Sequence, residues 1–557
     1  MSTIVPHAKL RAEVDALADV AGSIDFALAT ASQEERIARR NHLLGILRRY
    51  LEPRLADPTH PVVVAVFGPT GSGKSTLVNT LVGRPISAAG VLRPTTRRAV
   101  VWVHHRHAGA IESTLGPTGP LEVVADEHPV LGSLAIVDTP DIDSIAEEHR
   151  FQTSSILEAA DVGIAVTTPQ RYADAVPWEV LGDLTERSLD LVVVMNRTTR
   201  RSAGAVIDLA GLLRDAGVRG IESADDIVVI QEQRIRSDGR LHGYALRNLA
   251  RRLEVVASDH SGVVQRGIEA ACRHAAVVGR ELAREVEAQS AEGEALRSVV
   301  AEAVIAQQEE IGIRLQNGNL VRQEVVVRWQ RMIGVSDLAE LVSRGVSRLA
   351  DLAFPRKALS ADRITRVDQE VRTELVELGL RRAEQAASSI ELAWSLSTAG
   401  AALLESVEID WSGVRAELDE SMAEWQAQVV AMVADTGRTR HRLARAASVG
   451  INAAGTLLLL GVFASTGGLT GAELGVAAGA VAAQQTVLER VFGAAAASRL
   501  TKSAQALLSD NLGQVLTSAT AAHRQALDRV VDDHDAAARL EEACGALTAA
   551  LEDHIRD

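Results

Sequence analysis

The sequence of 557 residues is long enough for about three or four domains. Its net charge of −15 offers no overall electrostatic support for sequence-independent binding to nucleic acid, so we expect no nucleic-acid partner. Aromatic residues make up only 3% of a chain that is 47% hydrophobic, which predicts cores built from Ala, Val and Leu.

The composition also indicates the compartment. Cys272 and Cys544 stand far apart without metal-binding or redox spacing, so we expect both to be buried thiols in a reducing cytosol. Residues 1–20 carry Asp and Glu and lack an apolar core, so no secretory signal is expected there. The strong preference for Arg over Lys is typical of a GC-rich, bacterial genome.

Residues 1–60 are predicted to begin with two helices. Apolar side chains recur at three- and four-residue steps over 10–24, as on the buried face of a helix, and a second helix is expected over about 34–51. Three prolines then interrupt the pattern ahead of the first strand: Pro53, Pro58 and Pro61.

Residues 61–256 alternate short apolar runs with helical stretches. This alternation predicts an α/β fold, a doubly wound and mostly parallel sheet whose ligand site lies at the carboxyl ends of the strands. The runs expected to be strands are 62–67, 99–103, 134–138, 162–167, 191–195 and 227–231.

A complete phosphate-binding loop follows the first of these runs. Its residues are Gly68, Pro69, Thr70, Gly71, Ser72, Gly73, Lys74 and Ser75, and Thr76 continues into a predicted helix. The glycines let successive backbone N–H groups surround phosphate oxygens, and the helix N-terminus adds partial positive charge. We expect Lys74 to reach the β- and γ-phosphates and the Ser75 hydroxyl to bind Mg²⁺. Lysine is otherwise nearly avoided, since the only others are Lys9, Lys357 and Lys502.

Residues 257–557 are rich in Ala, Leu, Glu and Arg and contain no convincing strand. Long amphipathic helices, forming an all-α helical bundle or stalk, fit this region best. One apolar series at three- and four-residue steps consists of Leu418, Met422, Trp425, Val429 and Val433. Interruptions are expected near Pro355 and after Gly450.

An apolar hairpin is predicted over 446–488. The stretch 446–472 has no charged residue, a Gly-Gly pair at 467–468 supplies a turn, and a weaker apolar arm covers 474–488. Each arm is at or below the length of about 20 residues that spans a bilayer. Basic residues flank both ends, which favours membrane contact with both ends cytoplasmic. The alternative is a buried helix pair in a soluble bundle.

Three segments on the phosphate side resemble the translation-factor class of GTPases, especially the Era-like and dynamin-like branches. Residues 75–83 resemble the first helix of that class, 92–97 its switch I and 134–141 the entry to its switch II. This resemblance implies that Thr95 and Thr96 contribute to catalysis, with Thr96 also a metal ligand. It assigns Asp138, at the end of a predicted strand, to Mg²⁺. Asp141 replaces the family glycine near the γ-phosphate, and its carboxylate can repel phosphate.

The base-reading segment 193–199 departs from the family pattern. Asn196 matches, and Arg197 can cover the base with its aliphatic stem. Thr199 stands where the family aspartate pairs with guanine, and a hydroxyl cannot replace that charged, bidentate acceptor. We therefore expect binding of GTP and GDP with weakened selectivity over ATP.

Hydrolysis in this class is in-line attack of water on the γ-phosphate. Ile142 follows Asp141 where a water-positioning glutamine would be sought, so Thr95, Thr96 or a partner subunit is expected to supply this role. We therefore expect slow intrinsic turnover that dimerisation accelerates. Residues 171–178 form either core packing or a dimer contact, and the histidines at 104, 105 and 107 are expected in an exposed loop, not in a metal cluster.

The whole chain resembles a bacterial dynamin-like, or Era-like and membrane-tethered, GTPase. The resemblance implies that helices in 1–60 pack with the stalk, that 61–256 form the GTPase domain, and that 257–557 form the stalk. It implies a homodimer or a paired paralogue, lipid contact through 446–488, and a place at the cytoplasmic face of the plasma membrane, with the cytoplasm as alternative. Other functions remain open: a regulatory switch GTPase with a protein or ribosomal partner, an ATP-using protein, or an inactive nucleotide-binding scaffold.

Overall fold

The computed structural model describes residues 5–87, 98–142, 147–186, 189–317, 320–333, 361–438, 449–463, 488–489, 492–530, 533 and 535–556. These residues form two compact units. The first comprises Met1–Phe26, Ser32–Gln289 and Asp533–Asp557, and the second comprises Ala27–Ala31 and Ser290–Asp532. Each unit is described by itself.

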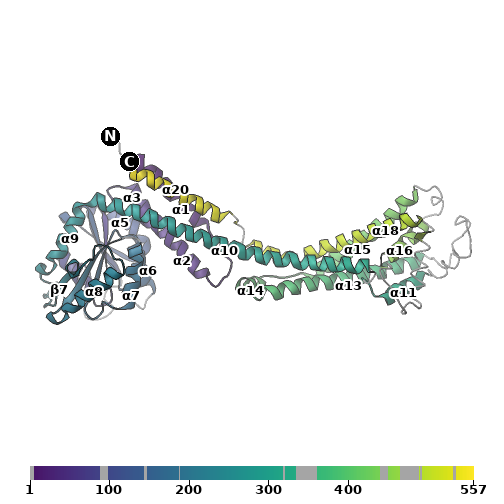
Figure 1. The fold of residues 1–557 in the computed structure, drawn as a ribbon, viewed down its shortest axis with the longest axis horizontal. Helices are drawn as coiled ribbons and strands as arrows, with labels where there is room; N and C mark the ends of the chain where they lie inside the picture. Colours follow the sequence, from purple (N-terminus) through teal and green to yellow (C-terminus); the bar gives the residue numbers. More distant parts are fainter. Residues whose placement is uncertain are drawn as a thin grey trace, which may run out of the picture. The chain divides into compact units, whose positions relative to one another are not determined.

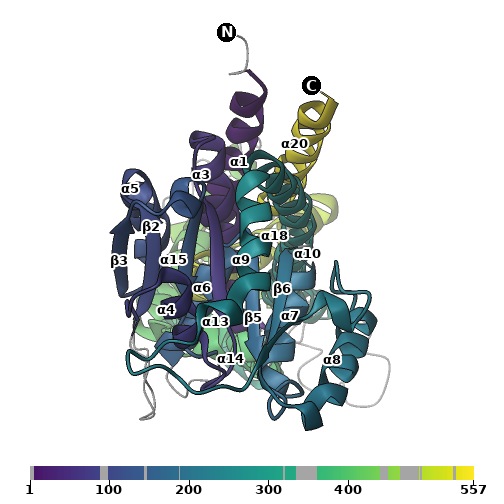
Figure 2. The ribbon, with the colours of Figure 1, turned by 90° about the vertical axis from the view of Figure 1, so that its left-hand side faces the viewer.

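The first unit is built on a seven-stranded sheet with the order β3-β2-β4-β1-β5-β6-β7. β4, β1, β5, β6 and β7 run parallel to one another, whereas β2 is antiparallel to β4, and β3 is parallel to β2. Figure 2 shows β3 and β2 toward one edge and β5 and β6 toward the other. The strands are β1 (Val62–Phe67), β2 (Ala99–His104), β3 (Leu121–Asp126), β4 (Leu134–Asp138), β5 (Val162–Thr167), β6 (Asp190–Thr198) and β7 (Val228–Gln231).

The doubly wound α/β prediction is confirmed, and so are the six expected strands within a few residues at their ends. The sequence prediction missed β3. This strand lies at the edge of the sheet, and Glu122 and Ala125 on it are exposed, so it lacks the continuous apolar run of a buried strand. Its end is held by the Trp102 Nε1 atom, which donates to Asp126 Oδ2 at 3.1 Å.

Alternate residues of the central strands enter two separate apolar cores, one on each face of the sheet. Helices α5 (Ala108–Leu115), α6 (Glu147–Glu158), α7 (Ala175–Glu186) and α8 (Ala203–Asp215) supply the core on one face. The helices that supply the other core are α1 (Val5–Ser23), α2 (Gln33–Leu44), α4 (Lys74–Val82), α9 (Arg247–Ser258), the first part of α10 (His260–Gln316) and α20 (Ala536–Arg556). Short 3₁₀ turns are η2 (His105–His107), η3 (Gly116–Thr118), η4 (Pro129–Gly132), η5 (Arg200–Ser202), η6 (Ala224–Asp226) and η7 (Gly243–Leu246).

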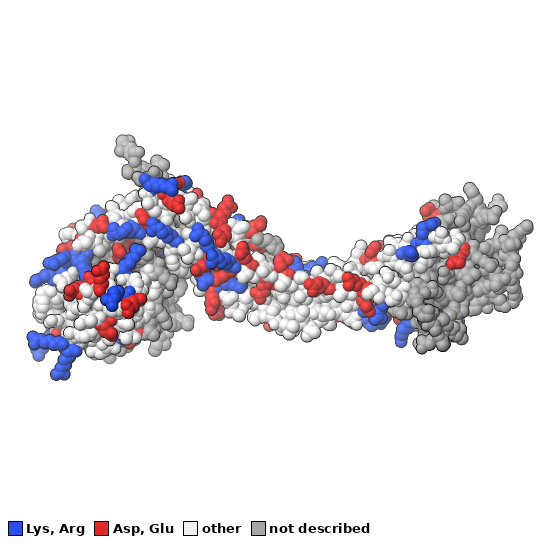
Figure 3. Space-filling view, in the orientation of Figure 1, with Lys and Arg blue, Asp and Glu red and all other residues white. Residues whose placement is uncertain are grey.

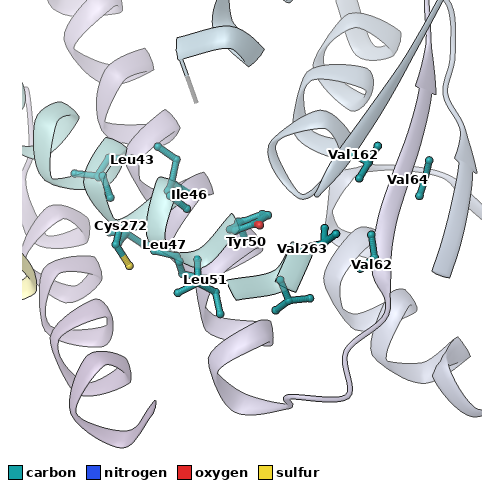
Figure 4. Close-up of a cluster of buried hydrophobic side chains, with 14 of the residues drawn as sticks. Leu43, Ile46, Leu47, Tyr50, Leu51, Val62, Val64, Val162, Val263 and Cys272 are labelled. Carbon is teal, nitrogen blue, oxygen red and sulfur yellow. The ribbon is translucent and has the colours of Figure 1, made fainter. Parts of the chain in front are cut away.

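The predicted second helix is longer than expected. α2 continues as a π-helical stretch, η1 (Gly45–Leu51), and then as α3 (Glu52–Ala56). Pro53 does not end it, because it lies in the first turn of α3, where a missing N–H costs no hydrogen bond. In Figure 4, Leu47, Tyr50 and Leu51 of this segment lie in one cluster with Val62 and Val263.

A buried ion pair ties this N-terminal segment to the sheet. Arg54 and Asp161 are fully buried, and two guanidinium nitrogens donate to the two carboxylate oxygens at 2.8 and 2.6 Å. The Tyr50 hydroxyl and the backbone N–H of Val63 donate to the same carboxylate at 2.8 and 2.7 Å. Asp161 precedes β5, so its carboxylate joins η1, α3, β1 and β5.

The compact units do not follow the predicted division at residues 60 and 256. The N-terminal helices, residues 257–289 and α20 all belong to the unit that contains the sheet, and α1 packs along α20. Contacts between segments so far apart in the chain leave no trace in local sequence periodicity. Both cysteines are buried in this unit as predicted, and burial raises the pKa of Cys272 to about 12 and that of Cys544 to about 11.

The second unit is a helical bundle, and its described residues contain no strand. In Figure 1, α13 and α15 run alongside each other in this unit. The helices are the remainder of α10, α11 (Gln323–Ile333), α13 (Ala361–Trp394), α14 (Thr398–Leu404), α15 (Trp411–Arg438), α16 (Val449–Phe463), α18 (Ala494–Ala519) and α19 (Ala521–Asp528). The predicted apolar series of α15 is buried throughout, so the helical prediction for this region is confirmed. Pro355 lies outside the described residues.

The first arm of the predicted hairpin corresponds to α16, which packs inside this bundle against α15, α18 and α13. Leu458, Leu459 and Leu460 are fully buried, and Phe463 packs edge-on against Trp329 and Trp425. The described part of this arm therefore matches the alternative of a buried helix. The expected turn at 467–468 and residues 474–487 of the second arm lie outside the described residues. No described helix combines the length and the apolar character needed to cross a bilayer.

Candidate nucleotide-binding site

The predicted phosphate loop connects β1 to α4 at the carboxyl end of the parallel strands. Gly68 and Gly73 have φ angles of 146° and 98°, which favour glycine. A Cβ atom on Gly68 would lie 2.1 Å from the Val166 carbonyl oxygen, and one on Gly73 would lie 2.4 Å from Asn196 Nδ2. Both close approaches exclude a side chain. Lys74, Ser75 and Thr76 form the first turn of α4, as the motif requires.

The ammonium group of Lys74 lies inside this loop. Its Nζ atom donates to the Gly68 carbonyl at 2.8 Å and to Asp141 Oδ1 at 2.5 Å, and the residue is only 4% exposed. Asp141 thus pairs with the lysine that the motif assigns to phosphate. A triphosphate that engages Lys74 must displace this carboxylate or share the cation with it.

Asp138 ends β4 directly beside β1, where it is paired in register with Val66. The carboxylate is fully buried; Oδ2 accepts a 2.6 Å hydrogen bond from Ser87 Oγ, whereas Oδ1 has no hydrogen-bond partner among the described residues. Burial raises the pKa of Asp138, and hydrogen bonds from Ser87 and Ser75 offset only part of this effect. A buried carboxylate that interacts with Ser75 and has one oxygen unsatisfied among the described residues fits a hard cation such as Mg²⁺.

Asn79 holds Ser87 in place. Its side-chain oxygen accepts from the backbone N–H groups of Ile86 and Ser87 at 2.8 and 2.9 Å, and its Nδ2 atom donates to the Ser87 carbonyl at 2.8 Å. Asn79 lies in the segment 75–83 that carries the resemblance, whereas Ser87 is not predicted by the sequence. A serine in a connecting loop carries no motif, so its contact with Asp138 is visible only in the structure.

Asn196 brings the predicted base side next to the phosphate side. Its Nδ2 atom donates to the Ser72 carbonyl at 2.8 Å, and its side-chain oxygen accepts from the Arg197 backbone at 2.9 Å. Arg197 has a φ of 57°, in the left-handed region that a side chain seldom adopts. The end of β6 is thus held against the loop by one carboxamide.

Thr199 has a structural role at the end of the same strand. It is the N-cap residue directly before η5; its backbone N–H donates to Ser202 Oγ at 2.7 Å, and its hydroxyl lies 3.3 Å from that atom. The side chain therefore caps the following turn. No carboxylate stands at this position to pair with a guanine edge.

Arg171, in the loop after β5, also contacts the phosphate loop. Its Nη1 atom donates to the Thr70 carbonyl and its Nε atom to Asp174 Oδ2, both at 2.7 Å. The sequence alone does not predict a role for this arginine. Trp178 is half-buried against one apolar core of the sheet and donates to the Tyr172 carbonyl at 2.9 Å, in line with the core-packing alternative.

The other residues named from the sequence lie outside the described ranges or away from the phosphate loop. Thr95 and Thr96 lie outside the described residues. His104 ends β2, and His105 and His107 follow in η2, where His105 is exposed as expected but His107 is buried. Since β2 runs opposite to β4, all three lie at the end of the strands away from the phosphate loop. No grouping of His, Cys, Asp and Glu side chains suited to a metal ion occurs in the described ranges. On the face shown in Figure 3, Lys and Arg are interspersed with Asp and Glu over the first unit.

The segment that contains the phosphate loop is similar to a known protein family. Residues 64–116 match the model of the dynamin family. No curated protein matches the sequence. Among solved structures, an oligomerised bacterial dynamin pair, described as a mechanism for long-range sensing and tethering of membranes, is 12% identical. The alignment covers 99% of this chain and 95% of that chain, with a TM-score of 0.40.

A second solved structure is the LeoA bacterial dynamin GTPase from ETEC, which is also 12% identical. That alignment covers 100% of this chain and 94% of the other, with a TM-score of 0.23. These scores are too low to carry an argument. The likeness to the dynamin family therefore rests on residues 64–116, the segment that begins in β1 and contains the phosphate loop.

Proposed function

We propose that this protein binds GTP together with Mg²⁺ and hydrolyses it to GDP and phosphate. The main support is the combination of Lys74 inside a glycine-bounded loop with the Oδ1 atom of Asp138 on the neighbouring strand, which has no hydrogen-bond partner among the described residues. The match of residues 64–116 to the dynamin family favours GTP as the nucleotide.

In the proposed reaction the chain positions the phosphates and neutralises their charge. Backbone N–H groups of the loop and Lys74 bind the β- and γ-phosphates. Ser75, Thr96 and Asp138 would hold Mg²⁺, which supplies charge neutralisation when bound. Asp138 takes part through Oδ1, since Ser87 already occupies Oδ2. Thr95, Thr96 or a group from a partner subunit would orient the attacking water.

The residues expected to read the base match the family pattern only in part. Asn196 and Arg197 stand at the expected positions, but Thr199 caps η5 and offers no charged acceptor. We therefore propose guanine preference with reduced selectivity. The absence of a carboxylate at Thr199 also supports the competing possibility that the protein uses ATP.

We further propose that nucleotide-driven dimerisation of the first unit, with itself or with a paired paralogue, is coupled to the helical unit, as in dynamin-like proteins. Lipid contact at the cytoplasmic face of the membrane would involve the apolar sequence between α16 and α18. The burial of α16 supports a second candidate, a regulatory switch GTPase that needs no membrane.

Purified full-length protein tests these proposals. A fluorescent GTP analogue should bind in the presence of Mg²⁺, GTP should displace it better than ATP, and phosphate release should be slow and should rise with protein concentration. Lys74→Ala should abolish binding, whereas Lys502→Ala, on the exposed side of α18, should not change it. Equal displacement by ATP and GTP would favour the ATP-using alternative.

Flotation with anionic liposomes tests the membrane half separately. Binding to liposomes that depends on nucleotide supports the coupled, dynamin-like function. Protein that binds and hydrolyses GTP but stays in the lipid-free fraction in every nucleotide state supports the regulatory switch instead.

A further inference from the structure

We propose that Arg171 is a catalytic residue that supplies a positive charge in cis to the transferred phosphoryl group. This inference rests on the proposed GTPase function. An arginine acting in this way stabilises charge on the phosphate oxygens in the transition state and contributes little to binding of the ground state.

The position of Arg171 follows from the topology of the sheet. β5 pairs directly with β1, and Phe67, the last residue before the phosphate loop, is in register with Ala165. The loop that follows β5 therefore begins beside the loop that follows β1. The 2.7 Å hydrogen bond from Arg171 Nη1 to the Thr70 carbonyl places the guanidinium against the middle of the phosphate loop.

The arginine is held in a defined orientation. Its backbone N–H and that of Tyr172 both donate to the Thr168 carbonyl, at 2.9 and 3.0 Å, which closes a tight turn after β5. Asp174 accepts from Nε at 2.7 Å and fixes the plane of the guanidinium. The Arg171 side chain is 30% exposed, so part of it faces solvent beside the loop.

The guanidinium geometry suits two tasks at once. It carries five N–H donors in a rigid plane, so Nε can hold Asp174 and Nη1 the Thr70 carbonyl while a donor of the same plane reaches a phosphate oxygen. A lysine at the same place would offer a single point charge. The planar fork is therefore the feature that the experiment should probe.

The charge at the site explains the need for a second cation. Asp138 and Asp141 bring two carboxylates to the loop, and Lys74 is already paired with Asp141 at 2.5 Å. Charge that develops on the γ-phosphoryl oxygens is thus poorly compensated by Lys74 alone. Ile142, which follows Asp141, has an apolar and buried side chain and cannot position water or donate to phosphate.

The alternative role for Arg171 is a structural clamp on the Thr70 carbonyl. The two roles predict different measurements. A clamp shapes the loop, so its loss should weaken binding of GDP and GTP as much as it slows hydrolysis. A catalytic arginine affects hydrolysis and binding of transition-state analogues, and leaves GDP affinity nearly unchanged.

The experiment uses full-length Arg171→Ala and Arg171→Lys, with Arg214→Ala, at the exposed end of α8, as the matched control. Single-turnover GTP hydrolysis, GDP affinity and trapping of GDP with aluminium fluoride are measured for each. We expect Arg171→Ala to slow hydrolysis by at least about 100-fold and to lose aluminium fluoride trapping. GDP affinity should change by less than about threefold, and Arg171→Lys should recover only part of the rate.

Mixing experiments separate action in cis from action in trans. Lys74→Ala protein retains Arg171 but cannot bind nucleotide, so adding it to Arg171→Ala protein should not restore hydrolysis. Restoration would overturn the assignment in cis. Unchanged hydrolysis in Arg171→Ala, or equal losses of hydrolysis and GDP affinity, would overturn the catalytic role while the GTPase function stands. A wild-type protein that binds GTP without hydrolysing it would overturn both.

Discussion

Lys74 and Asp141 form an ion pair with an Nζ–Oδ1 distance of 2.5 Å in the centre of the phosphate-binding loop. The side chains are 4% and 13% exposed, so water screens the pair only weakly. The motif lysine is therefore neutralised by a residue of its own chain, which stands where the GTPases that this segment resembles have glycine. Nucleotide binding at this site has to compete with an internal anion.

This competition makes Asp141 a determinant of affinity. We expect Asp141→Gly to bind a non-hydrolysable GTP analogue about tenfold more tightly, equivalent to about 1.4 kcal/mol, because the substitution frees Lys74 and removes a like charge from the phosphate. Asp141→Asn should give a smaller gain. Weaker binding by both variants, measured by titration calorimetry, would contradict the idea.

Substitution of Asp138 should have opposite effects on thermal stability and on Mg²⁺-dependent nucleotide binding. Because burial raises the pKa of its carboxylate, the ionised form destabilises the fold, and stability falls as pH rises from the unfolded value of 3.8 through the raised folded value. We expect Asp138→Asn to be at least as stable as wild type in thermal unfolding at neutral pH. Its nucleotide affinity should lose most of its dependence on Mg²⁺.

Ser87→Ala is the control for this variant, since it removes the hydrogen bond to Oδ2 and leaves the Asp138 charge in place. It should lower thermal stability and keep a Mg²⁺ response. A Mg²⁺ response that survives in Asp138→Asn would remove this carboxylate from the metal site.

The buried pair Arg54–Asp161 should be a major source of stability for the first unit. Asp161→Asn leaves the guanidinium buried without a counter-charge, and we expect a loss of about 3–5 kcal/mol in the free energy of unfolding. Urea denaturation followed by circular dichroism measures this loss. The exposed pair Lys9–Asp553 is the matched control: Asp553→Asn should have little measurable effect, because both of its side chains are solvated.

His60 should make the protein sensitive to acid. Burial, and next the charge of Arg54, lower the pKa of His60 from 6.5 to about 4. The unfolded chain binds more protons between these values, so the contribution of the neutral histidine is complete above pH about 6.5 and is lost as the pH falls toward 4, a change of about 3 kcal/mol. His60→Gln should flatten the pH dependence of the urea midpoint over this window, and an unchanged slope would rule out His60 as its origin.

The burial of α16 can be tested without lipid. The Leu459 side chain is completely buried in this bundle and has no accessible surface. We expect Leu459→Ala to lower the free energy of unfolding of the helical unit by about 2–5 kcal/mol in detergent-free buffer. Loss of liposome binding at full stability would instead assign Leu459 to a membrane contact.

Local pattern was sufficient for much of the fold and for the core of the site. The apolar run of β1, the glycines after it and Lys74 follow one another directly, so the strand, the loop and the start of α4 could be predicted from adjacent residues. The apolar series of α15 was predicted for the same reason. β3 was missed because an exposed edge strand does not need the apolar pattern of a buried one.

Contacts between distant segments were beyond such prediction. Ser87, Arg171 and Asp161 carry no motif, and each acquires its role only when the order of the strands brings its loop beside another. The apolar character of α16 was visible in the sequence, but the same character suits a membrane and a protein core. The neighbouring helices decided between them for the described residues.

The sequence by itself determined a phosphate-binding loop, an α/β sheet to carry it and a helical remainder, because these depend on residue types at short spacing. The tertiary structure alone decided which groups meet at that loop: Asp141 pairs with Lys74, Arg171 donates to the Thr70 carbonyl, and Asp138 keeps one oxygen without a hydrogen-bond partner among the described residues. Electrostatic interactions act over a few ångströms in space whatever the separation along the chain, so only the folded arrangement reveals them.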